Sequence, residues 1–121
     1  MSAQTTIVGR WGEAQVANWL KKRGYTLLAS GFRCRMGEID LIARDGDTVV
    51  FAEVKARKAG TSRFGRPCEA VDGKKQQHLR MAAEQWLSES GWTGFCRFDV
   101  LEVFLNDGST EPDINHMKNA F

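Results

Sequence analysis

Long apolar runs, cysteine pairs and histidine clusters are all missing from this 121-residue chain. No apolar stretch approaches the roughly 18–20 residues that a membrane span requires, and the N-terminus lacks the apolar core of a signal peptide. The three cysteines, Cys34, Cys68 and Cys96, are odd in number and widely spaced, which argues against a disulfide framework and a structural zinc site. We therefore expect a cytoplasmic protein without a membrane-spanning segment.

Histidine occurs only twice, as His78 and His116, and neither has a partner at the spacing of a metal-ligand pair or a catalytic triad. A glycine-rich phosphate-binding loop and a Gly-x-Ser-x-Gly nucleophile motif are also absent. These absences argue against histidine-dependent catalysis and against a serine nucleophile of the α/β-hydrolase type. The length, with 42% hydrophobic and 26% charged residues, suits one globular domain over residues 1–121.

Hydrophobic periodicity predicts helices and strands in an order typical of an α/β fold. The expected elements are a helix over 9–23, a strand over 25–29, a hairpin over 37–55, a loop over 56–71, a helix from the cap Asp72 to Ser90, and a strand over 95–105. The hairpin is antiparallel, and the helical crossover suits a parallel neighbour for the last strand. The order predicts a central mixed β-sheet flanked by helices.

Three charged residues, Asp40, Glu53 and Lys55, lie on one face of the predicted hairpin. Because side chains alternate between the faces of a strand, Asp40 points to one face while Ile39 and Leu41 point to the other. Glu53 and Lys55 share a face for the same reason. The hairpin therefore predicts two acids and a lysine close together.

The turn around Gly46 decides how closely the two carboxylates approach. A two-residue turn at 45–46 makes Glu53 the diagonal neighbour of Asp40, with about 7–8 Å between α-carbons. A longer loop that ends at Thr48 puts the two acids directly opposite each other, about 4.5–5.5 Å apart. A three-residue loop would separate them onto different faces.

Two carboxylates at this separation among apolar neighbours are costly to keep ionised unless a cation lies between them. A hard divalent ion such as Mg²⁺ or Mn²⁺ prefers such oxygen ligands. Lys55 could then orient an attacking water molecule or neutralise charge that develops on a phosphate. The alternative is a structural ion pair between Lys55 and Glu53 or Asp40.

Two further charged residues continue apolar helix stripes. Glu13 precedes Val16 and Leu20 at helical spacing, either as an acid favoured by the helix dipole or as a third member of the acidic cluster. Lys75 lies four residues before Leu79, either as a contact to a cleaved phosphate or as a lysine whose stem covers apolar surface. Both alternatives stay open for each residue.

Positive charge is concentrated in the middle of the chain. Residues 55–80 carry a local charge of +6, and residues 81–121 carry −5. A basic segment after a candidate metal site attracts a polyanion such as nucleic acid, although a solvated loop and helix face would have the same composition. The candidate nucleic-acid contacts are Arg57, Lys58, Arg63, Arg66, Lys74 and Lys75.

These motifs carry a resemblance to a known family. The segments GRWGEAQVANWL, GEIDLIARDG, VVFAEVKAR and RFDVLEV resemble the YraN family of bacterial proteins, within the restriction-endonuclease-like nuclease superfamily. The resemblance implies a restriction-endonuclease-like fold and covers nearly the whole chain.

The resemblance also implies roles for individual residues. Asp40 matches the metal-binding acid of the superfamily, and Glu53 and Lys55 match its Glu-x-Lys motif, with the Val54 backbone carbonyl as an additional ligand. Glu13 matches the first-helix glutamate of archaeal Holliday-junction resolvases. Lys75 falls where many superfamily members carry Lys or Gln.

The combined hypothesis is a nuclease dependent on Mg²⁺ or Mn²⁺ that hydrolyses phosphodiester bonds. DNA is favoured over RNA by analogy with the superfamily. Because the sequence contains no sign of a base-reading helix, we expect recognition of DNA structure, and a homodimer would suit branched DNA. The alternative is a nucleic-acid-binding module that keeps the fold without turnover.

Overall fold

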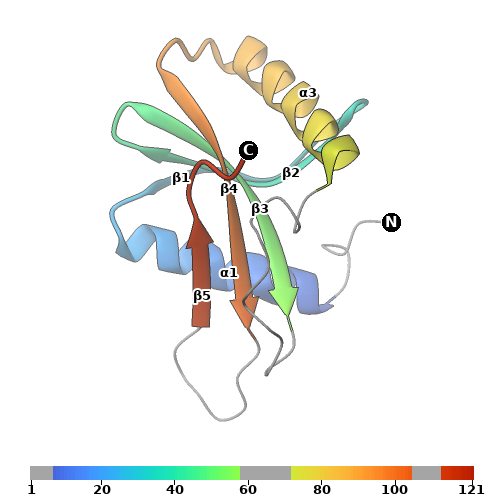
Figure 1. Cartoon of the computed structure of the whole chain (residues 1–121). Helices are drawn as coiled ribbons and strands as arrows, with labels where there is room; N and C mark the ends of the chain where they lie inside the picture. The colour runs from blue at the N-terminus through green and yellow to red at the C-terminus, as the bar shows by residue number, and fades with distance from the viewer. Residues whose placement is uncertain (1–6, 58–71, 105–112) are drawn as a thin grey trace.

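A computed structural model describes residues 7–57, 72–104 and 113–121. Five of its elements are strands of one sheet in the order β1-β2-β3-β4-β5, in which β3 and β4 are parallel and the other neighbours antiparallel (Figure 1). The elements are α1 (Ile7–Lys22), β1 (Thr26–Cys34), β2 (Gly37–Asp45), β3 (Thr48–Arg57), α3 (Gly73–Ser90), β4 (Phe95–Phe104) and β5 (Asp113–Met117). The predicted mixed sheet and its flanking helices are confirmed.

The helix ends follow the sequence signals closely. Asp72 caps α3 and accepts a hydrogen bond from the Lys75 backbone N–H at 2.8 Å, which satisfies one of the unpaired donors of the first turn. Gly91 ends the helix in the left-handed region (φ 71°), where a residue without a Cβ is favoured. These caps position the first turn of α3 beside the sheet.

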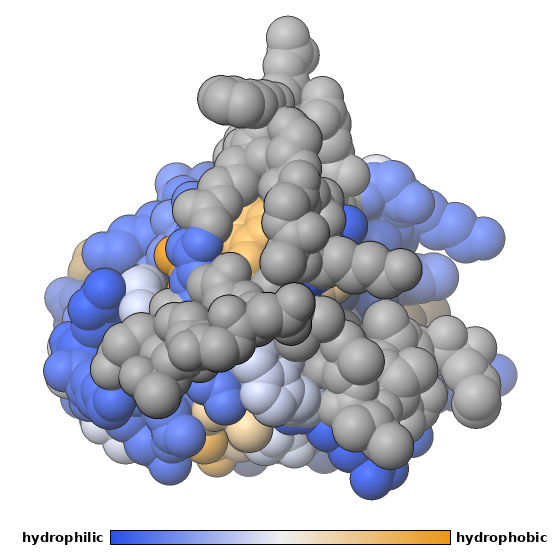
Figure 2. Space-filling model, turned by 90° about the horizontal axis from the view of Figure 1, so that it is seen from below, coloured by the Kyte–Doolittle hydropathy of each residue, from blue (hydrophilic) through white to orange (hydrophobic). Residues whose placement is uncertain are grey.

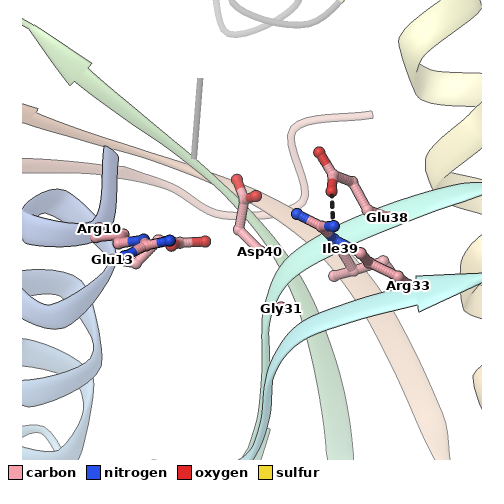
Figure 3. Close-up of a pocket in the computed structure, with 7 residues that line it drawn as sticks. All are labelled: Arg10, Glu13, Gly31, Arg33, Glu38, Ile39 and Asp40. Carbon is pink, nitrogen blue, oxygen red and sulfur yellow. Dashed lines mark ion pairs between the residues drawn. The ribbon is translucent and has the colours of Figure 1, made fainter. Parts of the chain in front are cut away.

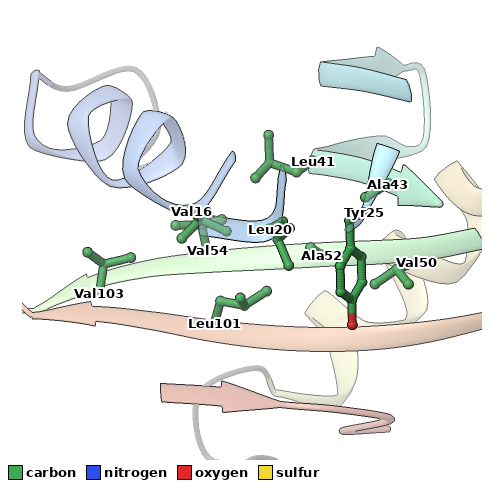
Figure 4. Close-up of a cluster of buried hydrophobic side chains, with 10 residues drawn as sticks. All are labelled: Val16, Leu20, Tyr25, Leu41, Ala43, Val50, Ala52, Val54, Leu101 and Val103. Carbon is green, nitrogen blue, oxygen red and sulfur yellow. The ribbon is translucent and has the colours of Figure 1, made fainter. Parts of the chain in front are cut away.

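Each face of the sheet carries its own apolar core. On the α1 face, Val16 and Leu20 belong to one buried cluster with Val50 and Val54 of β3 (Figure 4), and on the α3 face Leu79 packs in a second cluster. A fully buried leucine stabilises a fold by about 1.5–3 kcal/mol. β3 therefore lies between two cores, and its side chains alternate between them.

The sequence missed one strand and shortened another. The segment of β5 lacks an alternating apolar pattern, and it is a strand because it pairs with β4, with Val103 level with Ile114. β1 was predicted over 25–29 but continues to Cys34 past a register shift near Leu28. The predicted loop over 56–71 is partly wrong because β3 runs to Arg57, and residues 58–71 lie outside the described part of the chain.

Side chains on β2 do not alternate strictly, contrary to the prediction. Ile39 packs in the same cluster as Ile42, whereas Leu41 packs in the cluster on the α1 face. The reversal lies level with Gly31 of β1, which has a positive φ of 67° and stands between the residues that pair with Leu41 and Ile39. Asp40 lies at this irregularity and is buried there.

The C-terminal segment is held on the sheet by a fully buried aspartate, Asp99 of β4. Its carboxylate accepts hydrogen bonds from Arg97 Nε (3.0 Å) and the Asn119 backbone N–H (2.9 Å), and it lies 2.7 Å from His116 Nε2. Burial alone would raise the pKa of Asp99, but the hydrogen bonds from His116 and Arg97 overcome this effect and hold the pKa below its usual value. Sequence spacing had given His116 no partner, because the pair forms across 17 residues.

Apolar groups on the described surface are scattered. Seen from below, this surface is mainly hydrophilic with small apolar areas (Figure 2). The large exposed apolar side chains of the described residues, Leu28, Met36 and Phe95, come from three separate segments. Neither described helix is long and apolar enough to cross a membrane.

Candidate active site

The β2–β3 hairpin brings Asp40 and Glu53 to the same level of the sheet. Asp45 pairs with Thr48 and Leu41 pairs with Ala52, so Asp40 and Glu53 are the next residues on their strands. This is the closer of the two predicted registers, although the turn residues are Gly46 and Asp47. The prediction that the acids come together is confirmed.

Asp40 is buried, with 3% of its surface exposed. Its carboxylate, rather than a backbone carbonyl of β2, accepts a hydrogen bond from the backbone of β3. Its Oδ2 accepts a hydrogen bond from the Val54 backbone N–H at 2.8 Å. Burial, followed by the negative charge of Glu53, raises the pKa of Asp40 to about 9, although the Val54 hydrogen bond opposes the shift. Without a cation, the pair therefore retains a proton at neutral pH.

Glu53 is 1% exposed, and neither of its carboxylate oxygens accepts a hydrogen bond from the residues that the structure describes. Two lysines lie near the same oxygen: Lys55 Nζ is 3.5 Å from Oε1, and Lys75 Nζ is 3.7 Å from it. Both contacts are at ion-pair distance, beyond the usual 2.7–3.2 Å of a hydrogen bond. A buried carboxylate with so few partners is costly, and it can accept a further cation.

Glu13 reaches the same region from α1. Figure 3 shows Glu13 and Arg10 extending from α1 on one side of Asp40, with the ion pair of Arg33 and Glu38 on the other side. They line a pocket of about 270 Å³ formed by Arg10, Glu13, Gly31, Arg33, Glu38, Ile39 and Asp40. Of the two alternatives left open for Glu13, its place beside Asp40 favours membership of the acidic cluster, and its role there stays a prediction.

The electrostatic surroundings of Glu13 favour its protonated form. Burial is the largest cause, followed by the negative charges of Glu38 and Glu53, and together they raise the pKa of Glu13 to about 7. The helix dipole does not explain this acid, because α1 begins at Ile7 and Glu13 lies beyond the first turn, where the dipole effect has largely faded.

The oxygen atoms around Asp40 fit a hard divalent cation. Asp40 and Glu53 supply two carboxylates, and the Val54 carbonyl points to the same side of β3 as the Val54 N–H that contacts Asp40. Within residues 7–57, 72–104 and 113–121, no group of three or more His, Cys, Asp or Glu side chains is arranged to hold a metal ion. Two carboxylates and one carbonyl would suit Mg²⁺ or Mn²⁺, because these ions bind few protein ligands and keep several waters.

The predicted nucleic-acid contacts are only partly placed. Lys74 and Lys75 lie in the first turn of α3, where Lys74 is exposed and Lys75 points to Glu53. Arg57 Nε lies 3.3 Å from Glu102 Oε2 on β4. The other three candidates, Lys58, Arg63 and Arg66, lie outside the described residues.

Sequence reasoning missed the arginines that line the pocket. Arg33 of β1 is paired with Glu38 of β2. This pairing can be predicted only if β1 is extended past Gly31 and paired with β2. Arg10 lies one helical turn before Glu13, and this i, i+3 spacing is a signal that the sequence contains.

The sheet order, the helices on its two faces and the paired acids next to a Glu-x-Lys motif define a restriction-endonuclease-like α/β protein. The family model for the uncharacterised protein family UPF0102 matches residues 12–103. The chain belongs to this family, which is the YraN family that its motifs resemble.

Curated relatives match along nearly their whole length. The chain is 44% identical to a UPF0102 protein of Caldicellulosiruptor saccharolyticus, over 94% of this chain and 96% of the relative. It is 39% identical to a UPF0102 protein of Pelotomaculum thermopropionicum over 100% of both chains. A UPF0102 protein of Geobacter metallireducens is 40% identical, over 100% of this chain and 97% of the relative.

Proposed function

We propose that this protein is a divalent-metal-dependent nuclease that hydrolyses phosphodiester bonds of DNA. The observation that carries the proposal is the pair of buried carboxylates, Asp40 and Glu53, of which Glu53 has no hydrogen-bond donor among the described residues. Such a pair is costly in a protein that never binds a cation, because the two charges repel and neither is fully solvated.

Asp40, Glu53 and the Val54 carbonyl would hold Mg²⁺ or Mn²⁺. When bound, the ion would act as a Lewis acid that makes water more nucleophilic at neutral pH and neutralises phosphate charge. Lys55, 3.5 Å from Glu53, positions the attacking water and stabilises negative charge on the phosphate. Glu13 has a pKa raised to about 7, which suits a group that accepts a proton from water near neutral pH.

The nucleic-acid strand would cross the site next to the first turn of α3. Lys75 is 33% exposed and can exchange its Glu53 contact for a phosphate oxygen, and Lys74 is exposed beside it. Phosphate contacts of this kind position a backbone without reading its sequence. The proposal therefore includes recognition of DNA structure, with DNA preferred over RNA by analogy with the superfamily.

The decisive experiment is incubation of the protein with Mn²⁺ and labelled single-stranded, duplex, flap and four-way-junction DNA. Asp40→Ala is the test variant, and Glu84→Ala, which removes an exposed carboxylate further along α3, is the matched control. We expect cleavage by the wild type and the control but not by Asp40→Ala. Cleavage that persists in Asp40→Ala would refute the assignment of the metal site.

The second candidate function is a nucleic-acid-binding module without turnover. It is favoured by the two lysines near Glu53, which neutralise that carboxylate without a metal. In that case the wild type binds the labelled DNA without cleaving it, and Mn²⁺ leaves its melting temperature unchanged.

A homodimer would place two such sites on two strands of a branched substrate, and we include it in the proposal. Sedimentation with and without a four-way junction measures it. A monomer in both conditions would remove the dimer from the proposal and leave the chemistry unaffected.

A further inference from the structure

The pocket beside Asp40 is lined by cations that the proposed chemistry does not use. Arg10 comes from the first turn of α1 and Arg33 from the edge strand β1. Figure 3 shows Asp40 between Arg10, which extends from α1, and Arg33, which lies on the opposite side of this carboxylate. The acidic site is therefore flanked by positive charge on both sides.

The position of Arg10 runs against the preference of the helix. The N-terminus of a helix carries partial positive charge, so acids are favoured there and a cation costs a few tenths of a kcal/mol. The first turn of α1 contains no acid, and Arg10 adds a cation to it. Arg10 therefore adds positive charge to the pocket, which favours a negatively charged group there.

Arg33 is available to a ligand. Its side chain is 67% exposed, and its contact with Glu38 at 3.3 Å is a surface ion pair of the kind that contributes little to stability. Breaking the ion pair with Glu38 so that Arg33 can bind a phosphate oxygen therefore costs little free energy. A planar guanidinium is also well suited to phosphate, which it can contact through two N–H groups.

The acids of the pocket raise the alternative of a second cation site. Glu13, Glu38 and Asp40 all line it. However, no group of three such side chains in the described ranges is arranged to hold a metal ion, and two guanidinium groups share the pocket. A cation on Asp40 would offset that carboxylate. The two other acids, Glu13 and Glu38, are then balanced by Arg10 and Arg33, so an anion can enter next to Arg33.

We propose that this pocket, here called the arginine pocket, binds a backbone phosphate adjacent to the one that is cleaved, through Arg10 and Arg33. The inference rests on the proposed nucleic-acid function and adds a second phosphate-binding subsite to it. In the free protein Glu38 forms an ion pair with Arg33. When the nucleic-acid strand binds, its phosphate takes the place of the Glu38 carboxylate. Arg10 and Arg33 contact the strand and take no part in bond cleavage.

Fluorescence anisotropy with a labelled single-stranded oligonucleotide in Ca²⁺, with a denaturing gel to verify that the oligonucleotide stays intact, tests the subsite with a divalent cation present. We expect Arg10→Ala and Arg33→Ala each to weaken binding about threefold to fivefold. Each loss should also reduce the slope of log affinity against log salt by about 0.7, the value for one phosphate contact on a single strand. Arg44→Ala, which removes an exposed arginine at the other end of β2, is the control and should change neither quantity.

The Glu38→Gln variant gives the sharper test, because it should increase affinity. Removing the carboxylate releases Arg33, and we expect binding about threefold tighter than wild type. In an Arg33→Ala background the same substitution should give no gain, since the two residues act as one pair. An equal gain in both backgrounds would mean a general charge effect and would overturn the subsite.

Further outcomes separate this inference from the nuclease proposal. Unchanged affinity in both arginine variants would overturn the arginine pocket while Mn²⁺-dependent cleavage could stand. In the cleavage assay, Arg33→Ala should raise KM and leave kcat unchanged. If Glu38→Gln instead abolished Mn²⁺ stabilisation, the pocket would be a cation site and the inference would be wrong. A wild type that binds without cleaving would end the nuclease proposal alone.

Discussion

Asp40 and Asp99 are two buried aspartates whose surroundings have opposite effects on folding. They are 3% and 0% exposed, yet the pKa of Asp40 is raised to about 9 and the pKa of Asp99 is held below its usual value. We predict that Asp40→Asn increases the free energy of unfolding of the metal-free protein and that Asp99→Asn decreases it. Asparagine keeps an oxygen acceptor for the Val54 N–H and is neutral without taking up a proton, so the first substitution loses little hydrogen bonding and removes the cost of protonation.

The size of the Asp40→Asn effect follows from proton linkage. An unfolded aspartate loses its proton near pH 3.8, whereas folded Asp40 keeps it to about pH 9. Between these values folding takes up a proton, so the stability of the wild type falls as pH rises, by up to about 1.4 kcal/mol per pH unit. At pH 7 the ceiling is about 4 kcal/mol, and relaxation and water entry around the charge reduce it to an expected gain of about 1–3 kcal/mol.

The Asp99 effect has the opposite sign. A lowered pKa contributes stability that is present above about pH 4 and is lost as pH falls through the pKa of the folded state. Asp99→Asn removes the charge that balances Arg97, which is only 18% exposed, and breaking such a buried pair costs about 3–5 kcal/mol. The two variants therefore differ in sign although both remove one buried carboxylate.

Thermal unfolding in EDTA at pH 5 and pH 8 measures both effects. A change of 1 kcal/mol corresponds to about 4 °C for a domain of this size, so Asp40→Asn should melt several degrees above wild type at pH 8, with a smaller gain at pH 5. Mn²⁺ at 100 times its Kd adds about 2.7 kcal/mol to the wild type and should add less to the variant. Destabilisation by Asp40→Asn at pH 8 without metal would refute the claim that this carboxylate is held at a cost.

Three further predictions concern the lysine of the site and the packing that supports it. Lys55→Met should lower the cleavage rate by about 100-fold or more while Mn²⁺ still raises the melting temperature, and normal cleavage would remove Lys55 from the mechanism. Gly37→Ala should destabilise the protein by about 1–3 kcal/mol in urea unfolding, because its Cβ would lie 2.9 Å from the His78 carbonyl oxygen; wild-type stability would mean that α3 can shift away. Leu20→Ala should cost about 2–5 kcal/mol in the same assay, because this side chain is 1% exposed in the core under α1, and a loss below 1 kcal/mol would contradict that packing.

Much of the candidate site could be predicted because its central residues are local in sequence. Asp40, Glu53 and Lys55 lie on one hairpin, so the turn and the two-residue period of strands bring them together. Glu13 and Lys75 were found because a charge on an apolar helix stripe needs a partner on the facing element. The family resemblance added the Val54 carbonyl, which no side-chain pattern can indicate.

The less local features were harder to predict. The pairing of Arg33 with Glu38 depends on β1 continuing past Gly31, a residue that reads as a stop signal in the sequence. The strict alternation predicted for Ile39 fails at the same bend. Asp99 is fully buried and binds His116 from a strand that the sequence did not reveal.

The sequence by itself determined the order of helices and strands from α1 to β4, the antiparallel hairpin with its paired acids, and membership in a family. The first two follow from periodicity, turn residues and caps, which act over a few residues, and the third follows from the motifs. Tertiary structure alone decided how the acids are neutralised and what surrounds them: the two lysines near Glu53, the raised pKa of Asp40 and the arginine pocket. The physical reason is that burial and charge depend on distances between segments far apart in the chain, which only the packing of both helices onto the sheet defines.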